Sequence, residues 1–496
     1  RHPHTKVSSR GSSSDSLHAD TGRDLRALSR PRHPHEPPRS SPQLPEARRR
    51  HRPRLHSSHV IMGKGGEAPP SFIVSDENKE LLSGKSYAAT KLAPEDAWMA
   101  TLDHEKFRED VHAIGKALGA EQGPKDVAHL TKIVWWSRLC QYVGFATMWT
   151  CVNPVSIFLL SVGTLTRWTI IGHHVCHGGF DKCDKSKRYN RFTFGVGSLW
   201  RRSVDWLDWM LVEAWNVEHN QLHHYHLGEI ADPDLVEFNM DYLRTLDAPM
   251  ALKYAAVAFM SVTWKWWYYA PNTFKQLKAN ERRRAGLPPL EGVEAPQTFD
   301  FGWLVGKGDN TYVNGFEFLS RVLGPYFVQR FVLMPLPVLL ALGFPAYRTA
   351  CANLFLAELM TNFHSFVVIA TNHAGFDLYR FDKHCKPRSS TFYLRQVISS
   401  ANFDCGTDLV DFMHGFLNYQ VEHHLWPDLS MKSYQKAQPM IQALCKKHNV
   451  PYIKENVFKR LWLLTKVMVG TDSMRKYPNK YEYAPDIVAD EPAAAH

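Results

Sequence analysis

The stretch LCQYVGFATMWTCVNPVSIFLLSVGTLT, which spans residues 139–166, contains no charged side chain. About 20 mostly apolar residues cross a bilayer as a helix, and the flanking residues extend the apolar region in both directions. Asn153-Pro154 interrupts the stretch, because proline lacks the N–H group that a continuing helix needs. The sequence therefore predicts two membrane-crossing helices, at about 131–151 and 154–174, joined by a tight turn.

A second apolar region of similar form lies further along the chain, at about residues 322–372. Arg348 is its one charged residue near the middle, and we expect it to mark a short turn. Two more crossing helices are therefore predicted, at about 323–346 and 349–372. Glu358 falls inside the last of these, where an ionisable side chain is expected to face protein rather than lipid.

The distribution of charge predicts the orientation of these helices. The two short turns carry little charge, whereas the region of roughly 175–320 between the two hairpins is long and basic. By the positive-inside rule, this region and both chain ends are expected on the cytosolic side. Within it, Met250–Ala270 is apolar but contains two lysines, so we predict a helix in the membrane interface with an aromatic belt at Trp264–Tyr269.

The rest of the chain divides by composition. Residues 1–61 are rich in Arg, Pro, Ser and His, and no methionine precedes Met62, so we expect a disordered leader or a mistranslated upstream segment. Residues 62–125 are predicted to be a soluble N-terminal region, 126–465 a membrane domain and 466–496 a polar C-terminal tail. The predicted fold is an all-α integral membrane protein with four transmembrane helices in two hairpins, interfacial helices and a cytosolic helical cap.

Overall composition narrows the chemistry. The formal charge is +10, and the lysines and arginines cluster beside the apolar stretches, which favours a cytosolic membrane face over nucleic-acid binding. The eight cysteines include no CxxC pair and no disulfide-type spacing, which argues against a zinc ribbon and a disulfide scaffold. The 26 histidines are unusually many, and their positions carry the functional interpretation.

Four clusters of histidine are spaced for metal binding. They are His173-His-Val-Cys-His177, His219-Asn-Gln-Leu-His223-His224, Asn372-His373 and Gln420-Val-Glu-His423-His424. On a helix, residues four apart share a face, so histidines with this spacing can point at one metal ion. The predicted topology puts all four clusters at one membrane surface. The expected ligands are His173, His177, His219, His223, His224, His373, His423 and His424. Eight imidazoles exceed the need of one metal, so two metals are predicted.

The ligand type narrows the identity of the metal. Imidazole suits zinc, copper, iron and nickel, but a catalytic zinc site normally takes three protein ligands and the HExxH motif is absent. Iron that activates dioxygen fits best. Further candidate ligands, or residues that orient the ligands, are His174, Asn372, Gln420, Glu218 and Glu422. Asp232 and Asp234 are also expected to orient imidazoles, because a metal-bound histidine usually donates its second N–H. His364 lies on nearly the opposite helix face from His373 and is expected to be hydrogen bonded within the protein.

The order HxxxH, HxxxHH and QxxHH resembles the histidine boxes of the membrane fatty acyl desaturases, over roughly residues 130–465. The third box, Gln420-Val-Glu-His-His-Leu-Trp-Pro427, and the preceding Met413-His-Gly-Phe-Leu-Asn418 are most similar to the front-end desaturases. The second box is one residue longer than the usual HxxHH. The His-Pro-Gly-Gly haem motif of a fused cytochrome b5 domain is absent from the sequence.

The resemblance implies a di-iron enzyme that uses O2 to introduce a cis double bond into a fatty acyl lipid or acyl-CoA within membrane lipid. Electrons are expected from cytochrome b5 or a ferredoxin as a separate carrier. The endoplasmic reticulum is the favoured location and a plastid membrane is the alternative, with the histidine boxes on the cytosolic or stromal side. The other readings are an acyl hydroxylase on the same scaffold, a haem protein and a non-catalytic metal-binding membrane protein.

Overall fold

The computed structural model describes residues 92–290 and 312–488, all of which belong to one folded unit, Gly63–His496. The proposed leader at residues 1–61 lies outside the described residues, as does much of the proposed soluble region. The described chain is predominantly helical, as predicted. Its strands are short parallel pairs, namely β1 (Tyr379–Arg380) with β4 (Arg475–Lys476) and β2 (Ala401–Asn402) with β3 (Ile453–Lys454).

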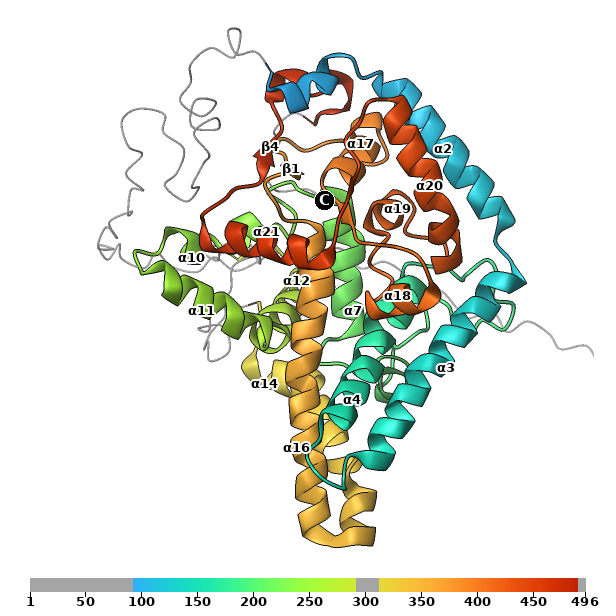
Figure 1. Cartoon of the computed structure of the whole chain (residues 1–496), viewed down its shortest axis with the longest axis vertical. Coiled ribbons are helices and arrows are strands. Elements are labelled where there is room, and N and C mark those ends of the chain that lie inside the picture. The colour runs from blue at the N-terminus through green and yellow to red at the C-terminus, as the bar shows by residue number, and fades with distance from the viewer. Residues whose placement is uncertain (1–91, 291–311, 489–496) are drawn as a thin grey trace, which may run out of the picture. The chain divides into compact units, whose positions relative to one another are not determined.

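The first predicted hairpin is present. Helix α3 (Pro124–Thr147) packs along α4 (Pro154–Thr166), and Pro154 opens α4 at its first position. The side chain of Asn153 caps α4 by accepting a hydrogen bond from the Ser156 N–H at 2.8 Å. Helix α4, which lies beside α3 in Figure 1, continues through the π-helical segment η3 (Arg167–Gly172) into α5 (His173–Cys176).

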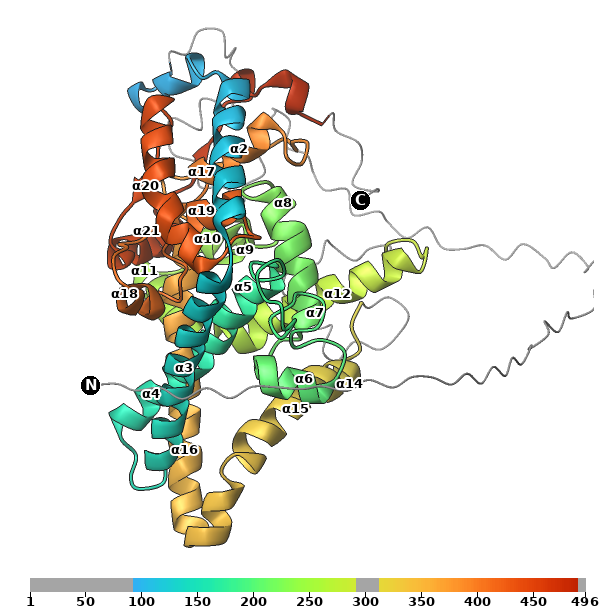
Figure 2. The ribbon, with the colours of Figure 1, turned by 90° about the vertical axis from the view of Figure 1, so that its right-hand side faces the viewer.

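The second hairpin turns earlier than predicted. A continuous helical segment descends through α14 (Gly315–Phe318), η7 (Leu319–Leu323), α15 (Gly324–Phe327) and η8 (Val328–Leu333), and it meets the lower end of α16 (Leu336–Ile369) in Figure 2. Within α16 the backbone leaves helical geometry at Gly343, where φ is 79°, and Pro345 follows. The predicted turn at Arg348 is therefore wrong. Gly343 turns the chain because glycine adopts positive φ without a steric penalty.

Two helical stretches of the described chain are long and apolar enough to cross a membrane. They are Pro154–Cys176 and Leu336–Asn372, the latter including η9 (Ala370–Asn372). Their positions match the second and fourth predicted crossing helices. They pack against each other through α4 and α16, and Asn353 of α16 accepts a hydrogen bond from the backbone N–H of Asn153 at 3.1 Å.

Shorter helices fill the region between the hairpins. They are α6 (Leu199–Arg201), η4 (Arg202–Trp206), α7 (Val212–Trp215), η5 (Asn216–His223), α8 (His224–His226), α9 (Val236–Asn239), α10 (Asp241–Thr245), α11 (Met250–Ser261), η6 (Lys265–Tyr269) and α12 (Ala270–Arg284). The expected interfacial helix is thus split between α11 and η6. The predicted aromatic belt is wrong, because Trp264 and Tyr269 are buried in the protein.

A buried ion network explains why η6 turns inward. Lys265 is fully buried, and its Nζ lies 3.4 Å from a carboxylate oxygen of Asp208 and 3.4 Å from one of Glu358. Arg330 also pairs with Glu358, with 3.0 Å between Nε and Oε1. The prediction that Glu358 faces protein is confirmed. Buried charges persist in low dielectric only when paired, so this network fixes η6 against α16.

The remaining helices form a cap around the C-terminal end of α16, which is its upper end in Figure 1. They are η2 (Pro94–Ala100), α2 (His104–Glu121), α17 (Ser390–Ile398), α18 (Asp408–Met413), α19 (Gln420–Leu425), α20 (Met431–Lys447), α21 (Val457–Val469), η10 (Asn479–Tyr481) and η11 (Ala484–Asp486). Helix α2 packs against α17 and α20, so distant parts of the chain build the cap together. The folded unit runs past residue 465: Tyr477 is buried, and Asp486 accepts a hydrogen bond from Ser390 at 2.6 Å.

Candidate metal centre

Four separate segments carry the predicted ligands to one place. The first residue of α5 is His173 and the residue directly after α5 is His177, and these two are one helical turn apart. The remaining six come from η5, α8, the residue after η9, and α19, and they are His219, His223, His224, His373, His423 and His424. All eight lie in the protein interior, and seven of them are buried.

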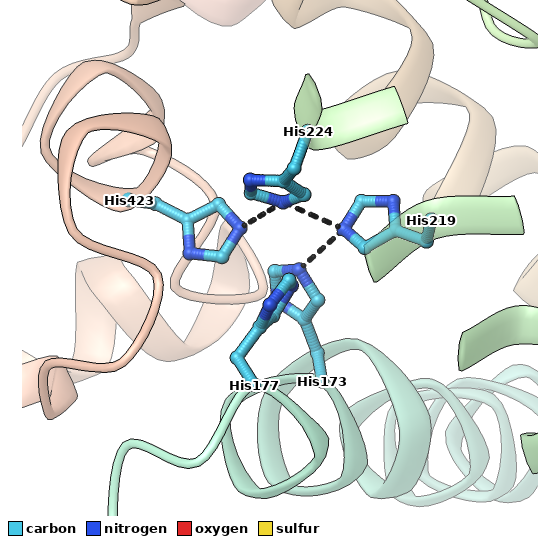
Figure 3. A group of neighbouring side chains, drawn as sticks. All are labelled: His173, His177, His219, His224 and His423. Atoms are coloured by element: carbon cyan, nitrogen blue, oxygen red, sulfur yellow. Dashed lines mark hydrogen bonds between the residues drawn. The ribbon is translucent and has the colours of Figure 1, made fainter. Parts of the chain in front are cut away.

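Five of these residues form what we call the five-histidine group, which consists of His173, His177, His219, His224 and His423. One ring nitrogen from each lies within 4.8 Å of the others. The Nε2 atoms of His173 and His219 are 3.1 Å apart, and those of His219 and His224 are 3.2 Å apart. Figure 3 shows the five rings turned toward a common centre, which is the arrangement expected of ligands of one metal ion.

The other three residues, His223, His373 and His424, form the three-histidine group. One ring nitrogen from each again lies within 4.8 Å of the others. The two groups adjoin, because the rings of His224 and His424 stack with their centroids 4.2 Å apart. The structure therefore divides the eight predicted ligands five to three between two neighbouring sites.

Polar partners orient four of the imidazoles. His223 donates from Nδ1 to Asp232 at 2.8 Å, and His424 donates from Nδ1 to the Gln396 side-chain oxygen at 3.0 Å. His373 donates from Nδ1 to the carbonyl of Ser399 at 3.1 Å, and His423 Nδ1 lies 3.4 Å from the Tyr434 hydroxyl. An N–H fixed at Nδ1 leaves the lone pair on Nε2 free for a metal. Sequence reasoning found Asp232 and missed Gln396, Ser399 and Tyr434, which no local spacing links to their histidines.

Two buried ring nitrogens support a fit to metal ions. The Nε2 atoms of His177 and His424 are buried and have no hydrogen-bond partner among the described residues. A buried polar atom without a partner is costly, and in native proteins it usually has a ligand, an ion or a water to satisfy it. These nitrogens belong to different groups, so each group has at least one buried nitrogen that a metal ion would satisfy. The residues present thus fit a pair of metal ions.

Protonation of these imidazoles is disfavoured. Burial, reinforced by neighbouring imidazoles, lowers the pKa of His177, His219 and His424 well below the usual range of histidine. Burial likewise lowers the pKa of His373 to about 3. His223 differs, because burial opposes its protonation but the carboxylate of Asp232 raises its pKa. Neutral imidazole is the form that binds metal, so burial keeps the two histidine groups in the protonation state that metal binding requires.

Three further candidates lie beside the groups. His174 donates from Nδ1 to the Ile170 carbonyl at 2.6 Å and belongs to neither group. The side-chain nitrogen of Gln420 lies 2.9 Å from His373 Nε2. Asn372 donates to the Leu417 carbonyl at 2.8 Å. Gln420 and Asn372 both line the cavity described below, so they are closer to a ligand role than His174 is.

The carboxylates predicted beside the boxes have different positions. Glu422 accepts hydrogen bonds from Asn402 Nδ2 at 2.7 Å and from the Tyr452 hydroxyl at 2.8 Å, so it turns away from the histidines. Burial raises its pKa to about 7. Glu218 is buried beside Asp234, and burial together with that neighbour raises its pKa. Neither glutamate belongs to a histidine group.

Asp234 lies beside one histidine of each group. Its carboxylate oxygen and one ring nitrogen each of His219 and His223 lie within 4.8 Å of one another. His219 belongs to the five-histidine group and His223 to the three-histidine group. Burial raises the pKa of Asp234 to about 6. The sequence predicted that Asp234 orients imidazoles, and its Oδ2 lies 3.8 Å from Nδ1 of His223, the nitrogen on the side away from the metal-facing Nε2, which is a position that suits this orienting role.

An apolar cavity of about 100 Å³ opens onto the histidines. His173, His219, His223 and His373 lie in its wall. Aromatic and aliphatic side chains make up much of the remaining wall, including Trp168, Trp215, Val236, Met240, Met260, Trp264, Tyr268, Tyr269, Phe366, Ile369, Leu464 and Met468. A cavity with so apolar a lining suits a hydrocarbon chain. The Trp264–Tyr269 cluster was visible in the sequence, but its role as cavity wall was not.

Comparisons with protein families and with known proteins identify relatives of this chain. The family model for fatty acid desaturases matches residues 147–456, which is more than half of the chain. The NADPH-dependent stearoyl-CoA 9-desaturase of Mycobacterium tuberculosis is 23% identical over 370 residues, which cover 72% of this chain and 77% of that protein.

Two eukaryotic relatives match over shorter segments. The Delta(8)-fatty-acid desaturase 1 of Arabidopsis thaliana is 37% identical over 93 residues, or 18% of this chain and 20% of that protein. The Delta(8)-fatty-acid desaturase of Euglena gracilis is 33% identical over 110 residues, which cover 22% of this chain and 25% of that protein. The chain belongs to the fatty acid desaturase family and is an oxidoreductase that desaturates a fatty acyl chain.

Proposed function

We propose that the two histidine groups hold two iron ions, and that the enzyme uses them with O2 to introduce a cis double bond into an acyl chain of a lipid or acyl-CoA. The observation that carries this proposal is the meeting of eight imidazoles, in two adjoining groups, at the wall of an apolar cavity. When bound, the iron pair supplies with dioxygen the oxidising power that no side chain has toward an unactivated methylene.

The protein's own residues would hold the metal ions and orient the imidazole rings. The five-histidine group would hold one ion and the three-histidine group the other, with Asp234 beside Nδ1 of His223, where it would help to orient that ring. Asp232 and Gln396 keep the N–H of His223 and His424 on Nδ1, so that each Nε2 faces its group. Loss of one such partner would free the ring to rotate away from its ion.

The cavity positions the substrate and excludes water. Trp168 and Trp215 lie in its wall at the ends of η3 and α7, which run directly into the histidine-bearing α5 and η5, so a bound chain is held in fixed relation to the histidines. Placement matters because an error of about 1 Å in a reacting group costs on the order of 100-fold in rate. A largely apolar wall also keeps bulk water from the reacting carbon.

The membrane arrangement follows from the same residues. We infer four crossing helices in two hairpins, formed by α3, α4–α5, residues 315–333 and α16, with the cap and the histidines on the cytosolic side. The endoplasmic reticulum is the favoured membrane. Electrons would come from a separate carrier, cytochrome b5 or a ferredoxin. The third box supports desaturation of the front-end type.

Expression in a host that lacks polyunsaturated fatty acids tests the proposal. Fed acyl chains should yield products two mass units lighter, and His177→Ala, His223→Ala and His424→Ala should each abolish them. His414→Ala is the matched control, because that histidine lies outside both groups. Retention of product in all three variants would refute the proposal. A product heavier by one oxygen would instead indicate an acyl hydroxylase.

A further inference from the structure

A second pocket, of about 200 Å³, lies on the other face of η3 from the apolar cavity at the histidines, which we call the acyl cavity. Trp168 and Thr169 of η3 line the acyl cavity, whereas Arg167 and Ile171 line this pocket, which we call the arginine pocket. Its opposite wall is one face of α3, and its floor is formed by residues of the segment 188–205. Because η3 separates the two cavities, the arginine pocket is distinct from the proposed desaturation site.

Three arginines converge on the arginine pocket, namely Arg138, Arg167 and Arg188, while Asp205 is the one carboxylate in its wall. Asp205 is already engaged, because it pairs with Arg188 through Oδ1 and accepts a hydrogen bond from the Gly195 N–H at 2.9 Å through Oδ2. The pocket therefore carries an excess of positive charge that the described chain does not neutralise.

Two of these guanidinium groups retain donors for a ligand. Arg138 is exposed and makes no ion pair among the described residues. Arg188 uses Nη2 for Asp205, but its Nη1 is buried and has no partner within the described ranges. Arg167 is held in place by donating to the Ser203 carbonyl at 2.9 Å. Guanidinium forks of this kind match the oxygens of a phosphate group.

Beside the pocket, α3 presents an apolar stripe to the outside. Trp135, Leu139 and Tyr142 are 56%, 60% and 58% exposed, and they recur at the spacing of one helix face. Arg138 stacks near Trp135, with 5.4 Å between the guanidinium carbon and the ring centroid. Basic groups next to an exposed apolar stripe match the two parts of a phospholipid, a charged headgroup and its acyl chains.

The pocket also lies at the right depth in the proposed membrane arrangement, on which this inference rests. Asn153 and Asn353 are level because they are hydrogen bonded. From Gly343 to Asn353 a helix rises about 15 Å, and from Asn153 to Arg167 it rises about another 20 Å. Arg167 is thus about 35 Å from the Gly343 turn and about 20 Å from the Asn153 turn. Counted from the Gly343 turn, it lies near the far edge of a hydrocarbon layer about 30 Å thick.

Arg138 reaches the same level as Arg167. Thr166, the residue before Arg167, donates a hydrogen bond to the Ser137 hydroxyl at 2.8 Å. We propose that the arginine pocket binds the phosphate of an anionic glycerophospholipid from the cytosolic leaflet, with its acyl chains along the stripe on α3. This lipid is not the substrate, since its site does not open into the acyl cavity. Binding would brace the α3–η3 pair against the segment 188–205.

The test measures ligand-induced thermal stabilisation of the purified full-length protein in a neutral detergent. Dihexanoyl phosphatidic acid is the probe, and dihexanoyl phosphatidylcholine and inorganic phosphate are the comparators. We expect phosphatidic acid to raise Tm the most. Arg138→Gln should raise the half-saturating concentration of phosphatidic acid by about fivefold, which is the contribution to affinity expected of one arginine near a charged surface. Arg348 is an exposed arginine in the N-terminal half of α16, away from the arginine pocket, and Arg348→Gln should leave the half-saturating concentration unchanged.

Three results would overturn the inference. Equal stabilisation by inorganic phosphate would reveal a free-anion site, and equal stabilisation by phosphatidylcholine would remove the preference for an anionic lipid. Unaltered binding by Arg138→Gln would place the lipid elsewhere. Binding is measured without turnover, so failure of the proposed desaturation chemistry would leave this result intact, and Arg138→Gln should retain wild-type product levels because Arg138 touches neither histidine group.

Discussion

Asp232 accepts a hydrogen bond from Nδ1 of His223 at 2.8 Å, and both side chains are buried. A carboxylate in this position raises the basicity of the imidazole and fixes its tautomer, which is how metal-binding histidines are usually supported. Asp232 also accepts the Gly228 N–H at 2.9 Å, so the carboxylate is itself held in place. The pair fixes the orientation of one imidazole of the three-histidine group.

Asp232→Ala should lower bound iron and product formation by about 10- to 100-fold, because His223 would lose the partner that orients it. Iron per chain, measured by elemental analysis of purified protein, and product level in the feeding assay report the effect. Asp247→Ala, at an exposed aspartate, is the control and should change neither quantity. Normal iron content in Asp232→Ala would show that the hydrogen bond does not support a ligand.

The five-to-three division predicts unequal effects of removing single ligands. His373→Ala leaves two imidazoles in its group, whereas His423→Ala leaves four in the larger one. We expect about one iron per chain in His373→Ala and a smaller loss in His423→Ala, with product abolished in both. Elemental analysis against wild type, which should hold about two irons, decides the matter. Equal loss of iron in both variants would contradict the division.

The buried ion network should dominate the stability of the membrane core. Lys265→Met leaves Asp208 and Glu358 with too little compensating charge, which typically costs about 3–5 kcal/mol. Thermal unfolding in detergent should show a large drop in Tm. Lys278→Met removes the partly exposed ion pairs of that lysine and should cost about 1 kcal/mol or less. A similar Tm for the two variants would mean that the network is dispensable.

Glu229 should make the cap sensitive to acid. Burial opposes its ionisation, but hydrogen bonds from His226 and His384 and the charge of Arg395 lower its pKa to about 2. A carboxyl whose folded pKa is depressed adds stability above its unfolded pKa of about 4.5 and loses it as pH falls toward 2. The Tm advantage of wild type over Glu229→Gln should therefore be constant from pH 7 to about 5 and shrink below that. A constant advantage at lower pH would argue against the depressed pKa.

The acyl cavity should limit the length of chain that the enzyme accepts. Met468 is buried in the wall of the cavity, and Met468→Trp would fill part of the volume. We expect the product profile of a mixed acyl feed to shift toward shorter chains, as measured by gas chromatography. Met440→Trp is the control, because Met440 is 39% exposed on α20 and lies outside the cavity wall. The same profile in both variants would exclude this cavity as the chain site.

The sequence predicted those features of the fold that depend on neighbouring residues and missed those that depend on residues far apart in the chain. The break at Asn153-Pro154 was found because proline and an asparagine cap act on their immediate neighbours. The second turn was misplaced, because Arg348 marked it by charge while Gly343 makes it by backbone conformation. Trp264 and Lys265 were assigned to the interface because their buried partners, such as Asp208 and Glu358, lie far away in the chain.

The sequence by itself determined the chemistry of the site, since the number of imidazoles and their one-turn spacing in His173 and His177 are local properties of the chain. Only the tertiary structure decided which imidazoles belong together. His423 and His224 are 199 positions apart, yet their Nε2 atoms lie 3.1 Å from each other. Contacts of that kind, like the bond from His424 to Gln396, depend on how whole helices pack. Periodicity sets the face of a helix on which a residue lies, whereas packing of all the elements sets what that face meets.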